Sequence, residues 1–289
     1  MYTAKIQNAQ GEILQLNDQE NKWAVLSITG LNPAPAQLSM SEIYGMDGSR
    51  MNYAKLTARN IVIMLRLCGD VEQNRLEIYH YFPQKAPVRF FYKTRTRDVY
   101  IDGYVETIEG DLYTQNEVFQ ISLICPDPFF RSVADFTVGI SNSQGGFEFP
   151  VAIDANDPIP FGTYESGRVT TIVNDENIDL PIDIYVRCLD AFSGLFKLQN
   201  VNTGETFAVN IVYATAAGDE WHICTDPAHI EFVGYRNGIG SNLLRFLASG
   251  SVFLQLHPGE NPFGYSVNNH ADNDKVEIVI KYRQLYTGV

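Results

Sequence analysis

The side chains best suited to chemistry in this sequence are its carboxylates. Asp and Glu together number 34 among 289 residues, and two carboxylates flanking a glycosidic bond carry out the reaction of most glycoside hydrolases. Any acidic sequence contains such pairs, so only their separation in space could identify a catalytic one. The sequence shows no phosphate-binding loop, nucleophile elbow or His-Glu-x-x-His motif. We therefore expect no enzyme and assign no catalytic or cofactor-binding residue.

Histidine and cysteine are the residues that could hold a transition metal. His222 and Cys224 are two residues apart, so they would share one face of a strand, and they are the nearest approach to a ligand pair. No second pair stands at the spacing of a zinc site. The other members of these types are scattered: His80, His229, His257, His270, Cys68, Cys125 and Cys188. The cysteines lie in apolar runs, which is typical of small buried side chains, and we expect no metal and no cofactor.

One oxygen-rich segment could supply ligands to calcium, Asp154-Ala-Asn-Asp157. This segment lacks the full spacing of a calcium-binding loop. A solvent-facing turn before Pro158 is the preferred interpretation.

The chain is acidic, with a formal net charge of −13. Binding to phosphates requires clustered cations, so specific contact with nucleic acid is not expected, although a protein of this charge could let DNA pass without binding it. The densest basic segment, Lys93-Thr-Arg-Thr-Arg97, is expected at an exposed hairpin end, where it could meet an acidic partner. No run of about 18 apolar residues predicts a membrane span, and residues 1–8 lack the apolar core of a signal peptide, so we expect folding in a cytosol.

A strand that runs into two prolines marks the expected boundary between two domains. Residues 119–125 alternate between apolar and polar, as in a strand with one buried face. Pro126 and Pro128 cannot donate ladder hydrogen bonds and should end that strand. The small polar residues of 141–146 suit a flexible connection. The sequence predicts an N-terminal domain over 1–130, a linker over 131–147 and a C-terminal domain over 148–289.

The first half is predicted to be mainly β with one helix. Asp70 is a good N-cap for a helix over 71–82, with Gln73 three residues further on and Pro83 after its end. Its buried stripe should contain Val71, Ile78, Tyr79 and Phe82. The expected strands cover residues 23–29, 59–67, 88–92, 99–108 and 117–125, and residues 41–48 should form a turn-rich loop.

The second half has almost no helical periodicity, and its short strands are spaced as in a β-sandwich. The expected strands lie within residues 182–188, 196–198, 207–213, 221–223, 230–232, 252–256 and 276–282. Gly204 should provide a positive φ in one hairpin, and His257-Pro-Gly-Glu260 has the composition of a type II turn.

Taken together, these segments resemble the distal tail protein family of long-tailed bacteriophages, the siphovirus tail component. In the first half the likeness lies in Gly30-Leu-Asn-Pro33, Met46-Asp-Gly48, Arg59-Asn-Ile-Val-Ile63 and Leu123-Ile-Cys-Pro-Asp-Pro-Phe-Phe130. In the second half it lies in Leu254-Gln-Leu-His-Pro-Gly-Glu-Asn261, Val276-Glu-Ile-Val-Ile-Lys-Tyr282 and Tyr286-Thr-Gly-Val289. The order and spacing of the motifs carry the resemblance.

The resemblance implies two β-sandwich-like domains, the first with one α-helix and the second galectin-like. It also implies a homohexameric ring at the tail tip of the virion, assembled in the host bacterial cytoplasm. Such a ring joins the tail tube protein to the tail-associated spike or lysin protein and serves as a baseplate hub for receptor-binding proteins. DNA would pass through the ring without specific binding, and no membrane would be involved.

Two other functions remain open from the residues alone. A two-domain carbohydrate-binding module could grip a host-surface saccharide with exposed Tyr or Trp side chains, for which Trp221 is the candidate, although the His-x-Asn-x-Arg strand of galectins is absent. A glycan-cleaving enzyme would need one pair among the many carboxylates.

Overall fold

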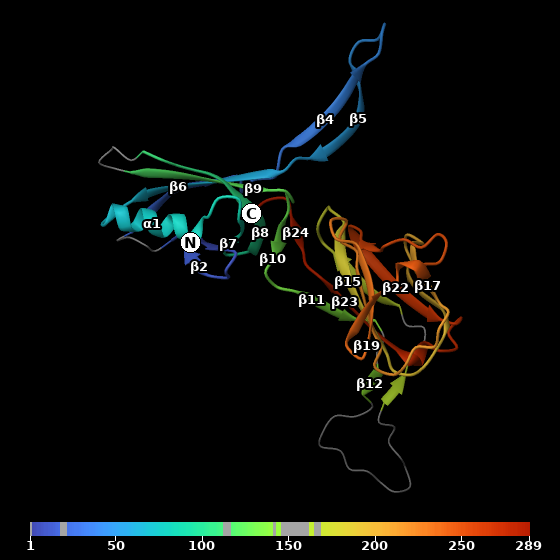
Figure 1. The fold of residues 1–289 in the computed structure, drawn as a ribbon. Helices are drawn as coiled ribbons and strands as arrows, with labels where there is room; N and C mark the ends of the chain where they lie inside the picture. The colour runs from blue at the N-terminus through green and yellow to red at the C-terminus, as the bar shows by residue number, and fades with distance from the viewer. Residues whose placement is uncertain (1, 18–21, 112–116, 141–142, 146–161, 165–168) are drawn as a thin grey trace. The chain divides into compact units, whose positions relative to one another are not determined.

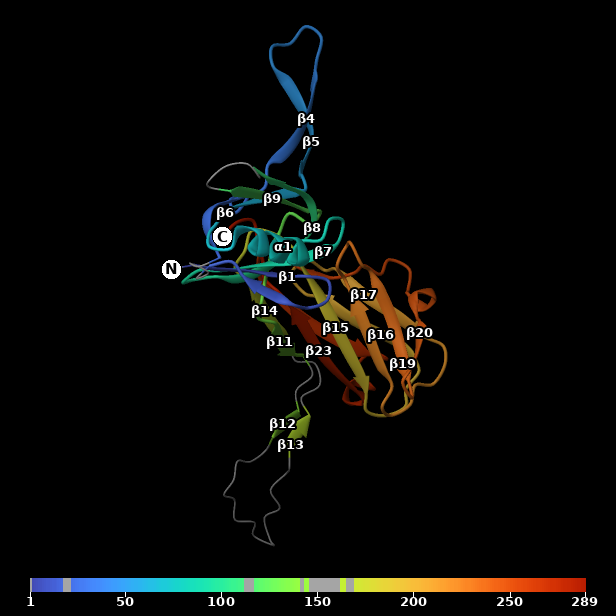
Figure 2. The ribbon, with the colours of Figure 1, turned by 60° about the vertical axis from the view of Figure 1, so that its left-hand side comes forward.

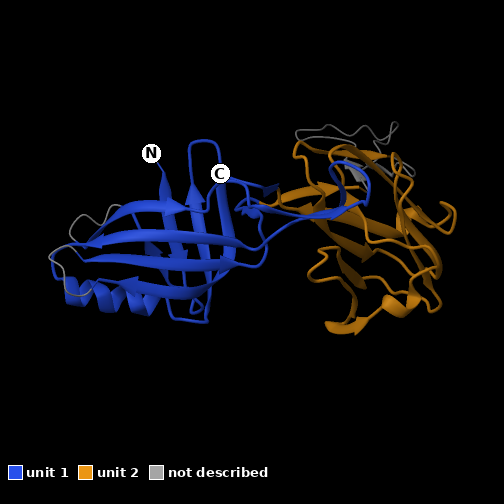
Figure 3. Cartoon of the chain, turned by 90° about the horizontal axis from the view of Figure 1, so that it is seen from above, with its two compact units in different colours: residues 1–134, 285–289 blue, residues 135–284 orange. Residues whose placement is uncertain are grey.

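The computed structural model describes residues 2–17, 22–111, 117–140, 143–145, 162–164 and 169–289. The chain folds into two compact units, residues 1–134 with 285–289 and residues 135–284 (Figure 3). All strand pairings are antiparallel among the described residues. Within the same residues there is one α-helix, which lies in the first unit. The predicted fold class, mainly β with a helix in the first part, is confirmed.

The first unit is built on one large sheet with the strand order β2-β1-β7-β8-β9-β6-β3 (Figure 1). Its strands are β1 (Thr3–Gln7), β2 (Ile13–Gln15), β3 (Trp23–Thr29), β6 (Arg59–Leu67), β7 (Pro87–Lys93), β8 (Asp98–Gly110) and β9 (Val118–Cys125). Two short strands extend it, β10 (Phe130–Ser132) on β8 and β24 (Leu285–Tyr286) on β10. The five strands expected in this half are all present.

The helix α1 (Val71–Tyr81) starts where the sequence predicts. The Asp70 carboxylate accepts a hydrogen bond from the backbone amide of Gln73 at 3.2 Å, so the expected cap is confirmed. Ile78 and Phe82 are buried, but Tyr79 is 42% exposed, contrary to prediction. Asn74 is buried in the helix instead. Its side-chain amide donates hydrogen bonds to the backbone carbonyls of Lys22 and Cys68 at 3.1 and 2.7 Å. The apolar periodicity of the sequence does not reveal such a polar contact.

A two-stranded hairpin, β4 (Ala36–Glu42) with β5 (Ser49–Leu56), projects from the first unit (Figures 1 and 2). The two strands pair with each other and with no other described strand. Residues 43–48 form the turn-rich connection that the sequence predicts, but residues 41–42 belong to β4. The sequence interpretation did not include this hairpin.

The segment expected as a linker is occupied by three short strands. β9 ends at Cys125, before the two prolines, as predicted. The chain then forms β10 in the first unit, β11 (Phe136–Gly139), which pairs with β23 (Val276–Tyr282) in the second, and β12 (Ser143–Gly145). The division between the units falls after Ala134, and residues 285–289 return to the first unit. Strands of three or four residues are too short for periodicity to reveal, which explains the difference from the expected 131–147 linker.

The second unit is a sandwich of two sheets. One has the order β11-β23-β15-β18-β19-β20, with β21 paired to β15, and the other the order β14-β22-β16-β17. The strands are β14 (Thr170–Asn174), β15 (Leu180–Cys188), β16 (Gly194–Asn200), β17 (Thr206–Ile211), β18 (Glu220–Cys224), β19 (Glu231–Arg236), β20 (Ile239–Asn242), β21 (Gln255–Leu256), β22 (Gly259–Val267) and β23 (Val276–Tyr282). The pair β12 (Ser143–Gly145) and β13 (Gly162–Tyr164) and the short helices η1 (Leu244–Phe246) and η2 (Asn273–Lys275) complete it.

Aromatic side chains hold the two sheets of the sandwich together. The ring centroids of Trp221 on β18 and Phe196 on β16 are 5.5 Å apart, and those of Phe207 on β17 and Phe232 on β19 are also 5.5 Å apart. Such edge-to-face pairs add to the free energy of apolar burial. The predicted 252–256 strand is reduced to β21, and β22 was not predicted. Across the described residues, no helix has the length and apolarity to cross a membrane.

Candidate functional site

The residues with metal-binding potential are engaged in other contacts. The Nε2 atom of His222 lies 3.1 Å from Oδ1 of Asp183, and its ring stacks on Tyr185 with centroids 4.7 Å apart. Burial raises the pKa of the Cys224 thiol to about 11, so it stays protonated at neutral pH. Nowhere in the described part of the chain do three or more His, Cys, Asp or Glu residues form a group that could hold a metal. Residues 154–157, the possible calcium segment, lie outside the described residues.

Cys125 and Cys188 are core residues, as expected from their apolar surroundings. Both are buried, and neither forms a disulfide. Burial raises the pKa of each thiol to about 12. A thiol needs to become a thiolate to act as a nucleophile, so these two are inert packing residues.

His257 connects two carboxylates in the second unit. Its Nε2 atom lies 2.8 Å from Glu205 and its Nδ1 atom 2.8 Å from Asp179. The hydrogen bond with Glu205 is the main cause that raises the pKa of His257. Nearby, the buried amide of Asn261 bonds the carbonyls of His257 and Gly259. This network joins three loops at one end of the sandwich and has a structural role.

Trp221, the candidate sugar platform, is 2% exposed. Its ring packs edge-on against Phe192, Phe196 and Phe232 in the sandwich core. A stacking platform must present a ring face to solvent, so this part of the carbohydrate-binding interpretation is wrong.

The most unusual surface of the protein is the β4–β5 hairpin. Nearly all of its residues are solvent-exposed, including many large apolar ones. Those exposed are Leu38, Met40, Ile43, Tyr44, Met46, Met51, Tyr53 and Leu56, and Tyr44 is wholly exposed. An isolated hairpin is marginally stable in water, and a contiguous exposed apolar surface usually marks an interaction site.

The strand register places most of the large apolar side chains of the two strands on one face. Directly opposed residues share a face in an antiparallel pair, and here the opposed pairs are Ala36 with Leu56, Leu38 with Ala54 and Met40 with Met51. We call these six residues the apolar face. The other face carries the pairs Gln37 with Lys55, Ser39 with Tyr53 and Ser41 with Arg50, and we call it the polar face.

A β-bulge keeps the apolar face continuous. The register shifts between Ser39 and Met40, where β5 contributes one extra residue, Asn52. In an unbroken register, Asn52 would lie opposite Met40, and Met51 would lie opposite Ser41 on the polar face. A shift of one residue exchanges the two faces of a strand. Three of the five methionines lie in the hairpin or its turn. Their flexible side chains can adapt to a partner surface.

The base of the hairpin is fixed by a buried arginine. The guanidinium of Arg59 donates to the carbonyls of Gly30 and Asn32, each at 2.5 Å, and to those of Pro128 and Thr287 at 2.9 and 2.5 Å. It also lies 4.5 Å from the centroid of the Phe130 ring. Burial lowers the pKa of Arg59. One side chain thus connects the segment leading into β4, the proline exit of β9 and the C-terminal residues.

Gly30 and Gly288 allow the backbone to approach closely at this base. Gly30 has φ +83, and a Cβ there would lie 2.1 Å from the carbonyl oxygen of Asn60. A Cβ on Gly288 would lie 3.0 to 3.1 Å from Pro33 and from the carbonyl oxygen of Leu31. The amide of Val289 donates to that same carbonyl at 3.1 Å. The hairpin therefore projects from a well-packed base.

Neither a protein-family model nor a curated protein matches the sequence. Among solved structures, the crystal structure of the Dit protein of phage SPP1 matches with a TM-score of 0.69 and 14% identity, over 99% of each chain. The fold is that of SPP1 Dit. SPP1 Dit is described as a paradigm of the hub adsorption apparatus in phages that infect Gram-positive bacteria. A chain of the phage P2 baseplate in its calcium-activated conformation matches with a TM-score of 0.51 and 12% identity, over the whole of both chains.

The likeness to SPP1 Dit extends over both units, so the resemblance to distal tail proteins is confirmed at the level of the fold. The sequence predicts no catalytic, cofactor-binding or metal-binding residue, and the exposed hairpin is a surface that was not predicted. Leu38 and Met40 alternate with polar residues before a turn that contains Gly45 and Gly48, and this pattern could have revealed the hairpin.

Proposed function

We propose that this chain is a structural distal tail protein of a phage, or of a related tail-like particle, located at the tail tip of the virion and assembled in the host bacterial cytoplasm. The exposed apolar face of the hairpin is the observation that carries the proposal, because it needs a protein partner. The full-length likeness of the fold to SPP1 Dit and to a P2 baseplate chain supports it.

In this proposal the first unit forms a homohexameric ring. The second unit, a galectin-like sandwich, lies at the periphery of the hub. The ring joins the tail tube protein to the tail-associated spike or lysin protein and carries receptor-binding proteins. The net charge of −13 favours passage of DNA without specific binding. The protein would act by assembly and catalyse no reaction.

Immunogold electron microscopy tests the location. Particles produced from the genome that encodes this chain should carry gold at the tail end distant from the capsid when labelled with an antibody against the second unit. Particles produced from a genome that lacks this gene are the control for background label. Label on the capsid, along the whole tail or on no particle would contradict the proposed function.

A further inference from the structure

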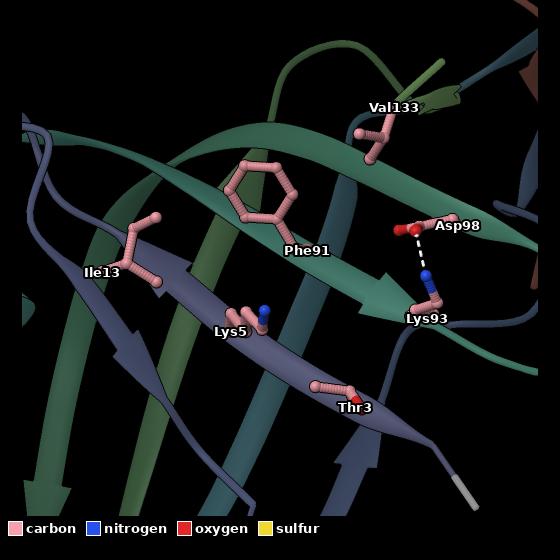
Figure 4. A pocket seen from close by; sticks show the side chains of 7 residues that line it. All are labelled: Thr3, Lys5, Ile13, Phe91, Lys93, Asp98 and Val133. Carbon is pink, nitrogen blue, oxygen red and sulfur yellow. Dashed lines mark hydrogen bonds and ion pairs between the residues drawn. The ribbon is translucent and has the colours of Figure 1, made fainter.

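The outer face of the first unit's sheet contains a shallow hollow of about 240 Å³ (Figure 4). It is lined by Thr3 and Lys5 on β1, Ile13 on β2, Phe91 and Lys93 on β7, Asp98 on β8 and Val133. The strand register makes neighbours of these side chains, with Lys5 opposite Phe91 and Lys93 opposite Asp98. Alternation along β1 turns Ala4 and Ile6 toward the core and Lys5 away from it.

The hollow combines an apolar floor with a cationic rim. Ile13 and Val133 are 56% and 42% exposed, and the ring of Phe91 lies between them (Figure 4). Lys93 forms an ion pair with Asp98 at 2.6 Å. Lys5 forms no ion pair with any residue that the structure describes. In a chain of net charge −13, this rim is a local site of positive charge.

The tip of the hairpin, residues 42–47, has the complementary composition. Its sequence is Glu-Ile-Tyr-Gly-Met-Asp, with a carboxylate at each end and three large apolar side chains between them. Tyr44 is wholly exposed, and Ile43 and Met46 are also exposed. The hollow is smaller than the roughly 300 to 1,000 Å³ of pockets that hold drug-sized ligands, so it suits one or two side chains. Tyrosine is a common anchor residue in such interface pockets.

The hairpin and the hollow are attached to opposite ends of the same sheet. The hairpin connects β3 to β6 at one end of the strand order, whereas the hollow lies on β2, β1 and β7 at the other end. A contact between such different surfaces of identical chains is heterologous, and its repetition closes a ring when the rotation permits.

We propose that the hairpin tip of one copy docks into this hollow of the next copy, with Glu42 and Asp47 near Lys5 and Lys93 and with Tyr44 on the apolar floor. This inference rests on the proposed function, because it names the surfaces that join neighbouring copies in the ring. Charge complementarity selects the partner and orientation, and apolar burial provides most of the affinity.

A charge exchange in the full chain tests the inference. Lys5→Glu with Lys93→Glu places like charges across the contact and should raise the concentration needed for half-assembly at least about tenfold. Glu42→Lys with Asp47→Lys should have the same effect. The chain that carries all four substitutions should assemble nearly as the wild type does. Lys85→Glu with Arg66→Glu, at two exposed cations of the first unit outside the hollow, is the matched control and should assemble normally.

Native mass spectrometry measures the assembly, and the fluorescence of the two buried tryptophans, Trp23 and Trp221, verifies that each variant is folded. Normal assembly of the Lys5/Lys93 variant would overturn the inference, as would failure of the fourfold variant to recover. Either result would show that the tip does not dock in this hollow, and assembly of the wild-type chain would still support the proposed function. A wild-type chain that does not assemble would instead count against the proposed function.

Discussion

At the scale of single residues, buried polar side chains stabilise the fold of the first unit. Arg59 is buried, and its guanidinium is bonded to four backbone carbonyls. Arginine suits this role because its planar group presents five donors in a fixed geometry. Loss of such a side chain would leave buried carbonyls without partners, which costs about 1 to 3 kcal/mol for each group. The residue is therefore a structural anchor for the hairpin base.

His257 should make the stability of the second unit depend on pH. Its pKa is raised, first by the hydrogen bond with Glu205 and further by the bond with Asp179. A group with a raised folded pKa contributes stability below its unfolded pKa, near 6.5, and loses that contribution as pH rises through the folded value. We expect His257→Gln to lower the unfolding free energy by about 1 to 2 kcal/mol at pH 6 and by less at pH 8.

Denaturant titration of the Trp23→Phe background, in which Trp221 alone reports the second unit, measures this effect. His229→Gln is the control, because His229 is well exposed and lies 3.3 Å from a single carboxylate, Glu231. An equal loss of stability at both pH values in the His257 variant would contradict the assignment.

At the scale of elements, the proposed role of the hairpin in assembly can be tested apart from folding, because the hairpin residues are exposed. Leu38→Glu with Met51→Glu places two charges on the apolar face, whereas Gln37→Glu with Ser41→Glu places two on the polar face. All four residues are solvent-exposed, so each double variant should unfold within about 1 kcal/mol of the wild type. The apolar-face variant should lose assembly in sedimentation velocity, and the polar-face variant should keep it. Equal behaviour of the two would refute the assignment of the faces.

Long strands and the helix could be predicted from the sequence, because each repeats its apolar side chains several times at a regular spacing. β6, β9, β15 and β23 have seven to nine residues with alternating burial, and α1 carries its own cap and stop signals. β10, β11, β21 and β24 have two to four residues, and a strand this short depends on its neighbour's hydrogen bonds.

The β4–β5 hairpin was not predicted from the sequence, for a different reason. Its apolar residues are not buried in a core, and its alternation is interrupted by the bulge at Asn52. The function of such an arm depends on a second molecule, which one sequence does not contain.

At the scale of the whole molecule, the chain has three features that support the proposed role in assembly. It has two separate compact units, a fold matched along its full length by SPP1 Dit, and an apolar hairpin attached to a rigid base. A hairpin at one end of a sheet and a complementary hollow at the other allow identical copies to join head to tail. The proposed assembly is a closed ring, and the resemblance to distal tail proteins sets its expected size at six copies.

Native mass spectrometry of the purified wild-type chain tests this claim most directly. We predict a species of six times the mass of one chain that persists on dilution through the micromolar range, because a closed ring requires two contacts to break before a copy leaves. A single-chain mass at every concentration up to the highest soluble one, or an open series of masses with no preference for six, would contradict the account.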